Sequence, residues 1–230
     1  MATILVTGAN RGLGLEFIKH YLDRGDHVIG TFRDKHSSDE LIQMGVTYDK
    51  LEIISLDVSS EKSLKTFPNL LGDIAIDIFI NNAGVYGPRN SSFKHVDIET
   101  WIPALKINTI APVILTQLII DNLKKGSKKK LIYITSKMGS IDDNSGGGSY
   151  VYRSTKAALN AVVKSLSIDL KSEEMIVALL HPGWVQTDMG GPNGLIDKNT
   201  SVSGMIKVID SLERSESGCF LDYTGSDIPW

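Results

Sequence analysis

Thr7-Gly8-Ala9-Asn10-Arg11-Gly12-Leu13-Gly14 separates two hydrophobic patterns of different period near the start of the chain. Before it, residues 4–7 form a continuous apolar run, which is typical of a strand buried on both faces. After it, residues 13–24 carry apolar side chains at helical spacing, and Gly25 stands where a helix C-cap is expected. The order of strand, glycine turn and helix predicts the first unit of a parallel α/β sheet.

The rest of the chain repeats this alternation. Further strands are predicted at residues 27–31, 51–56, 74–80, 131–135 and 176–180. Helices are predicted at residues 61–71, shortened by Pro68, at 100–123, kinked near Pro112, and at 152–171 and 202–212. Strands alternating with helices predict a Rossmann-type, doubly wound parallel sheet with helices on both faces, in one domain over residues 1–230.

The composition excludes several classes of protein. The 230 residues are 42% hydrophobic and 22% charged, as expected for a folded globular chain. A net charge of -3 is too small for a dedicated nucleic-acid binder, and the basic run 124–130 is interpreted as a solvated loop. The single cysteine, Cys219, argues against a disulfide or a Cys-rich zinc site, and His181 has no second ligand nearby, so no metal is expected. Neither a signal peptide nor a membrane span is recognisable, so we expect a cytoplasmic protein.

The glycine turn has the chemistry of a phosphate site. Gly8, Gly12 and Gly14 follow the spacing G-x-x-x-G-x-G, and Arg11 adds a cation beside them. Glycines allow a sharp turn and a close approach of the backbone. A helix N-terminus offers unpaired N–H groups and a partial positive charge, which suit a pyrophosphate. The position after the first strand favours dinucleotide binding over a plain glycine-rich loop.

The end of the second strand bears on which dinucleotide is bound. An acidic side chain there would bind the ribose 2′-hydroxyl of NAD, whereas a cation suits the 2′-phosphate of NADP. The sequence reads Gly30-Thr31-Phe32-Arg33-Asp34, so Arg33 favours NADP(H) over NAD(H). NAD(H) remains the alternative, because the acidic Asp34 follows Arg33 directly and because Arg33 can also be a solvated surface charge.

Other polar residues follow predicted strands. Asp57 and Val58 come after the third strand, and Asn82-Ala83-Gly84 comes after the fourth. In an open parallel sheet, ligands bind outside the carboxyl ends of the strands, so these residues are expected to line the cofactor site. Asp, Asn and Gly are also ordinary turn residues, which is the alternative.

Tyr152 and Lys156 are the candidate chemical pair. They are four residues apart and share one face of a predicted helix, although such pairs also occur on solvated helix surfaces. An ammonium beside a phenol is expected to lower the phenol's pKa from about 10. Such a tyrosine can exchange a proton with a carbonyl or alcohol oxygen. Ser136, after the fifth strand, is placed to hydrogen-bond that oxygen, and Asn108 to anchor Lys156 through a water or a main-chain carbonyl.

These elements together resemble the short-chain dehydrogenase/reductase family over essentially the whole chain. Within it, residues 7–14, 152–160 and 181–191 and the C-terminal residues 217–230 are similar to the C-factor and sniffer-type carbonyl reductase branch. The resemblance rests on residues 7–14, Asp57-Val58, Asn81-Asn82-Ala83-Gly84, Asn108, Ser136, Tyr152 with Lys156, and His181-Pro182-Gly183.

The resemblance implies a role for each residue. Tyr152 would be the acid/base, Lys156 would tune it and bind the nicotinamide ribose, Ser136 would hold the carbonyl, and Asn108 would complete a proton relay. Homodimers or homotetramers are implied by helix pairing in the family. The cofactor would be lined by the turn and by residues after the strands: Gly8, Asn10, Arg11, Gly12, Leu13, Gly14, Arg33, Asp57, Val58, Asn82, Ala83, Gly84, Pro182, Val185 and Thr187.

The leading hypothesis is an NADP(H)-dependent oxidoreductase that reduces a carbonyl compound, an aldehyde or a ketone, to an alcohol. A dinucleotide-binding signalling or scaffold protein, like C-factor, is the second hypothesis. A sugar-nucleotide epimerase shares the Tyr-x-x-x-Lys pattern but usually needs a longer chain. The sequence identifies neither the substrate nor the direction of the reaction, and no nucleic acid or membrane partner is expected.

Overall fold

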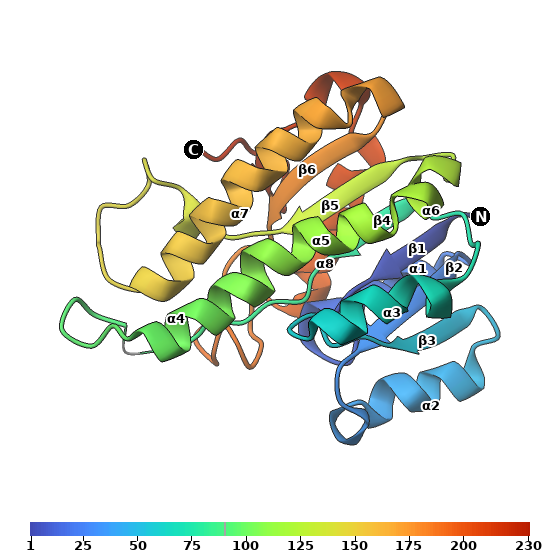
Figure 1. Ribbon diagram of the computed structural model, residues 1–230, viewed down its shortest axis with the longest axis horizontal. Helices are drawn as coiled ribbons and strands as arrows, with labels where there is room; N and C mark the ends of the chain where they lie inside the picture. The colour runs from blue at the N-terminus through green and yellow to red at the C-terminus, as the bar shows by residue number, and fades with distance from the viewer. Residues whose placement is uncertain (90) are drawn as a thin grey trace.

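The computed structural model describes residues 1–89 and 91–230, and its centre is a parallel sheet (Figure 1). Within these residues the sheet has seven strands in the order β3-β2-β1-β4-β5-β6-β7, and every neighbouring pair is parallel. The strands are β1 (Thr3–Val6), β2 (His27–Phe32), β3 (Leu51–Ser55), β4 (Ile78–Asn81), β5 (Lys130–Ile134), β6 (Ile176–His181) and β7 (Cys219–Asp222). The strand order reverses between β1 and β4, which is where such sheets open a ligand crevice.

Helices cover both faces of the sheet. They are α1 (Gly12–Asp23), α2 (Asp39–Thr47), α3 (Glu61–Leu71), α4 (Ile98–Leu105), α5 (Ala111–Leu118), α6 (Ile120–Lys125), α7 (Tyr150–Asp169) and α8 (Lys198–Ser211). In β1, Ile4 and Val6 pack into the cluster that α1 and α8 complete, whereas Leu5 packs on the opposite face with α3, α5 and α7. Figure 1 shows α3, α5 and α7 side by side across that face. The continuous apolar runs therefore mark strands buried on both faces, as predicted.

The predicted strands all occur, with one large shift in bounds. The fourth begins at Ile78 rather than at residue 74. The prediction missed α2, in which only Leu41 is buried, and the four-residue strand β7. The expected shortening of α3 by Pro68 is wrong, because the helix continues to Leu71 and ends at Gly72, whose φ is +67°.

The predicted helix 100–123 is interrupted rather than simply kinked. Residues Lys106–Ile110 form a π-helical turn between α4 and α5, in which the N–H of Ala111 donates to the carbonyl of Lys106. Pro112 has no N–H, so the carbonyl of Asn108 cannot accept the α-helical bond four residues on. A second break lies at Ile119. The π turn places Asn108 inside the protein, where it is 1% exposed.

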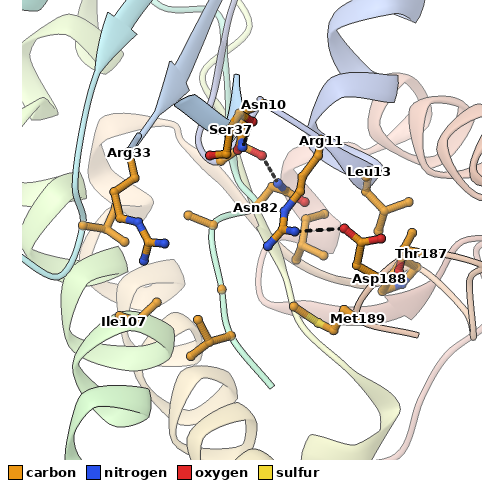
Figure 2. A pocket seen from close by; sticks show the side chains of 18 of the residues that line it. Asn10, Arg11, Leu13, Arg33, Ser37, Asn82, Ile107, Thr187, Asp188 and Met189 are labelled. Atoms are coloured by element: carbon orange, nitrogen blue, oxygen red, sulfur yellow. Dashed lines mark hydrogen bonds and ion pairs between the residues drawn. The ribbon is translucent and has the colours of Figure 1, made fainter. Parts of the chain in front are cut away.

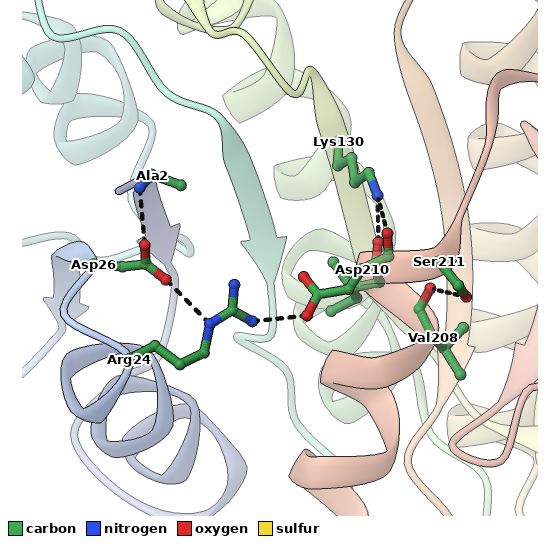
Figure 3. A network of polar contacts seen from close by, with 8 residues as sticks. Ala2, Arg24, Asp26, Lys130, Val208, Asp210 and Ser211 are labelled. Atoms are coloured by element: carbon green, nitrogen blue, oxygen red, sulfur yellow. Dashed lines mark hydrogen bonds and ion pairs between the residues drawn. The ribbon is translucent and has the colours of Figure 1, made fainter.

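The amino end of the sheet is held by charged side chains (Figure 3). Lys130, the first residue of β5, donates from Nζ to the carbonyls of Ile209 and Asp210 at the end of α8. Arg24 forms ion pairs with Asp210 at 2.9 Å and with Asp26 at 3.3 Å. A carboxylate oxygen of Asp26 accepts the N–H of Ala2. These contacts join β1, α1, β5 and α8 on the side of the sheet opposite the crevice.

No helix in residues 1–89 and 91–230 is both long and apolar enough to span a membrane.

Candidate active site

The glycine turn between β1 and α1 is shaped by three different constraints. Gly8 and Gly12 have φ values of +64° and +58°, which disfavour other residues. A Cβ on Gly8 would also lie 3.0 Å from Cα of Ala83, so the turn packs directly on the segment after β4. A Cβ on Gly14 would lie 2.2 Å from the carbonyl oxygen of Gly8. Gly14 therefore lets α1 pack against the turn.

A cavity of about 510 Å³ opens at the carboxyl ends of the strands, beside this turn. Most of the residues that were predicted to bind a cofactor line this cavity. Gly14 does not line it, and Val185 lines an adjoining cavity instead. The predicted residues in its wall are Gly8, Asn10, Arg11, Gly12, Leu13, Arg33, Asp57, Val58, Asn82, Ala83, Gly84, Tyr152, Lys156, Pro182 and Thr187.

Side chains of β1 and β4 hold the floor of this cavity together. The hydroxyl of Thr7 accepts the N–H groups of Asn82 and Ala83, both at 3.0 Å. Asn82 Nδ2 in turn donates to the carbonyls of Thr7 and Gly8, at 2.9 and 3.0 Å. Asn82 thus fixes the glycine turn from the neighbouring strand, a contact that spacing along the chain does not show.

Two cationic side chains, Arg11 and Arg33, line the same cavity. Figure 2 shows Arg33 extending from the end of β2 into it. Asp34 also lines the cavity, but its carboxylate accepts the N–H of His36 at 3.0 Å and so caps a short turn. Arg11 pairs with Asp188 at 2.9 Å across the opening (Figure 2), and both side chains are exposed.

A second cavity, also of about 510 Å³, adjoins the first. Tyr152 lines both cavities. Lys156 lines only the first, and Ser136 lines only the second. The structure therefore brings three of the four predicted catalytic residues to the boundary between the two cavities.

The electrostatics of Tyr152 and Lys156 differ from the prediction. Burial raises the pKa of Tyr152 to about 12, while the neighbouring Ser136 hydroxyl acts to lower it. Burial lowers the pKa of Lys156 to about 8. The prediction that Lys156 pulls the phenol's pKa below 10 is wrong for this structure. The ammonium lies 6.0 Å from the ring centroid, and the cost of burying a phenolate outweighs its attraction.

Asn108 contacts neither cavity. Its Oδ1 accepts the N–H of Val85, and its Nδ2 donates to the carbonyl of Val85 and to the hydroxyl of Thr155, all within 2.9 Å. The side chain makes no hydrogen bond to Lys156, whose Nζ donates instead to the carbonyl of Ile134 at 2.9 Å. Asn108 thus holds the segment after β4 against α7.

Sequence reasoning missed several residues of the site. The ring of Tyr86 stacks on that of Tyr152, with centroids 4.4 Å apart, and its hydroxyl lies 3.2 Å from that of Ser149. Arg89 donates to the carbonyl of Asp188 at 2.9 Å. Both follow Asn82-Ala83-Gly84 in one loop, so extending that motif along the chain would have found them.

The model of the short chain dehydrogenase family matches residues 2–195, and the chain belongs to this family. Relatives of the chain are described as oxidoreductases and dehydrogenases, and this chain is an NAD(P)-dependent enzyme of that class. The C-signal protein of Myxococcus xanthus is 44% identical over 155 residues, covering 67% of this chain and 93% of that protein.

Two solved structures share the whole fold. The carbonyl reductase Sniffer of D. melanogaster has a TM-score of 0.93 and 32% identity, with 100% of both chains covered. An NADPH-bound carbonyl reductase from chicken fatty liver has a TM-score of 0.92 and 32% identity, covering 100% of this chain and 99% of that one. The predicted family and fold are confirmed.

Proposed function

We propose that the protein reduces an aldehyde or ketone to an alcohol with NADP(H), and that Tyr152 is the general acid. The observation that carries the proposal is the position of Tyr152 at the boundary of two cavities. Lys156 lies in the wall of the first cavity, which also contains the glycine turn, and Ser136 lies in the wall of the second cavity. The first cavity suits the cofactor, and the second suits the carbonyl compound.

The protonation states fit the direction of reduction. With a pKa of about 12, Tyr152 carries its proton at neutral pH and is ready to donate it to a carbonyl oxygen. The nicotinamide, when bound, supplies the hydride. Ser136 is placed to hydrogen-bond the same oxygen. With a pKa of about 8, Lys156 is mostly charged at pH 7 and stabilises the phenolate left after proton transfer.

The first cavity has the features of a phosphate and dinucleotide site. The N-terminus of α1 and the tight glycine turn present N–H groups beside Arg11. Arg33 projects into the cavity, while the carboxylate of Asp34 is engaged with the N–H of His36. This arrangement supports NADP(H) over NAD(H), as do similar structures described as holding NADPH or NADP.

The test is a comparison of two tyrosines on one helix. Tyr152→Phe is expected to lower turnover of a carbonyl compound by about 10²–10⁴-fold, since it removes the general acid, while NADPH titration gives an affinity close to that of the parent. Tyr150→Phe is the matched control, because Tyr150 is exposed and lines neither cavity. Unchanged turnover in Tyr152→Phe would remove Tyr152 from the mechanism.

Similarity to the C-signal protein favours a second candidate, a dinucleotide-binding signalling or scaffold protein. A scan of aldehydes, ketones and diketones with NADPH separates the two. Cofactor oxidation with any of them supports the reductase, and NADPH binding with no oxidation supports the second candidate.

We also propose that the 230 residues form one domain, act in the cytoplasm and assemble as a homodimer or homotetramer. Sedimentation of the purified protein tests the assembly. A monomer at micromolar concentration would contradict it.

A further inference from the structure

The second cavity carries an excess of positive charge. In the part of the chain that the structure describes, its wall contains Arg89, Lys137 and Arg153, against the single carboxylate of Asp143. Asp143 is already paired with Lys137 at 3.1 Å. The two guanidinium groups therefore face this cavity without a carboxylate among the described residues.

Arg153 has most of its hydrogen-bonding capacity unused. A guanidinium has five N–H donors. In Arg153, Nη1 makes one long bond of 3.3 Å to the carbonyl of Met138, and the buried Nε has no partner. A buried nitrogen without an acceptor is costly, so the half-buried Arg153 is a candidate for a ligand that would offer acceptors to its guanidinium.

His181 supplies a second unsatisfied group in the same wall. Its Nδ1 is buried and has no hydrogen-bond partner among the described residues. Burial lowers the pKa of His181 to about 4, so the ring is neutral at pH 7 and offers a hydrogen bond rather than a charge. Two residues of this cavity wall, one on α7 and one at the end of β6, thus each carry a buried nitrogen without a hydrogen-bond partner among the described residues.

Arg89 lies at the entrance to this cavity. It donates from Nη2 to the carbonyls of Asp188 and Met189, at 2.9 and 3.4 Å. Neutral carbonyls satisfy donors but leave the positive charge of the guanidinium uncompensated. Arg89 therefore adds to the electrostatic attraction of an anion toward Arg153.

We propose that the second cavity takes a carbonyl compound that also carries a carboxylate group, an oxo acid, and that Arg153 binds this carboxylate. The inference rests on the proposed reductase function and assigns its substrate class. A planar guanidinium matches a carboxylate through two parallel hydrogen bonds. Tyr152 and Ser136 in the same wall are placed for the carbonyl oxygen, and Met138, Trp184 and Met189 supply apolar contacts for the chain between the two groups.

The experiment compares a short oxo acid with its methyl ester, which differ in one charge. With NADPH in excess, the kcat/KM of the unmodified enzyme is expected to favour the acid by at least tenfold. Arg153→Met is expected to lower this acid-over-ester ratio by at least tenfold, and Arg153→Lys to restore part of it. Arg214→Met is the matched control, since Arg214 pairs with Glu174 at the opposite end of the sheet and its loss should leave the ratio unchanged. Thermal melting and NADPH titration establish that each variant is folded.

Several outcomes would overturn the assignment. These are a preference of the unmodified enzyme for the ester, an unchanged ratio in Arg153→Met, or a preference for a phosphorylated carbonyl compound over the oxo acid. The failure of the reductase proposal looks different, because then neither acid nor ester would oxidise NADPH in any variant.

Discussion

Two buried lysines stand at opposite ends of β5 and show how the ends of the sheet differ. Lys130 begins the strand, and Lys156 donates to the carbonyl of Ile134 where the strand ends. Burial lowers the pKa of both. Lys130 donates to two carbonyls at the end of α8, where the helix dipole and Asp210 favour its charge. Lys156 has one main-chain acceptor and lines a cavity beside Tyr152.

The two lysines differ in the groups that accept hydrogen bonds from their ammonium groups. An ammonium has three donors. The acceptors around Lys130 are main-chain carbonyls of the protein, and its hydrogen bonds to them hold β5 and α8 together. Lys156 keeps donors available toward the cavity, which leaves them for a ligand. The same residue type, buried at both ends of the strand, thus serves structure at one end and chemistry at the other.

The largest effect that would test this comparison is on activity. Lys156→Met is expected to lower kcat/KM by about 10²–10⁴-fold, because the charge that stabilises the phenolate of Tyr152 is lost. Steady-state assays with NADPH measure it, and Lys130→Met serves as the matched control at the other end of β5. Equal losses in both variants would remove the functional distinction between the two lysines.

The second effect is on the pH dependence of stability. Between pH 8 and 10.5 the unfolded chain keeps the Lys156 proton while the native state, with a pKa of about 8, releases it. The unfolded state then binds more protons, so the free energy of unfolding rises with pH, by up to about 3 kcal/mol. Urea denaturation at several pH values should show this rise in the difference between the parent and Lys156→Met, because the raised pKa values of Cys219 and Tyr152 act in the opposite sense in both proteins. A rise of the same size in the variant would contradict the lowered pKa of Lys156.

A smaller effect is expected at the amino end. Lys130→Met should lower the free energy of unfolding by about 2 kcal/mol, since the carbonyls of Ile209 and Asp210 lose their donor. Chemical denaturation at pH 7 measures this, with kcat/KM expected to stay within about twofold of the parent. A stable Lys130→Met variant with impaired turnover would reverse the roles assigned here.

The smallest effect concerns the exposed part of the same network. Asp210→Asn is expected to cost less than about 1 kcal/mol, because the side chains of Arg24 and Asp210 are partly solvated and the pair of Arg24 with the buried Asp26 stays in place. The cost should shrink in high salt, which weakens exposed ion pairs. A loss as large as that of Lys130→Met, independent of salt, would show that the network acts as one unit.

The candidate site was predictable where its residues follow strands. Gly8, Asn82 and Ser136 could be placed near one rim because parallel strands end on the same edge of a sheet. Asn108 was predicted to anchor Lys156 through a water or a main-chain carbonyl, which stays a prediction; the sequence did not show that the π turn before Pro112 directs its amide to Val85 and Thr155. Gly14 was assigned to the cofactor, but it packs against Gly8. Helix α2 was missed although Leu41, Ile42, Met44 and Val46 give it apolar positions, of which only Leu41 is buried.

The sequence by itself determined the alternation of strands and helices, the conformation of the glycine turn and the identity of the reactive side chains. Those properties depend on hydrophobic period and backbone sterics, which act over a few residues. Only the tertiary structure decided that Tyr152 is made less acidic, that Tyr86 stacks on it, and that Arg153 and His181 border one cavity. Burial and contacts between distant segments set these properties, and both arise when the chain packs in three dimensions.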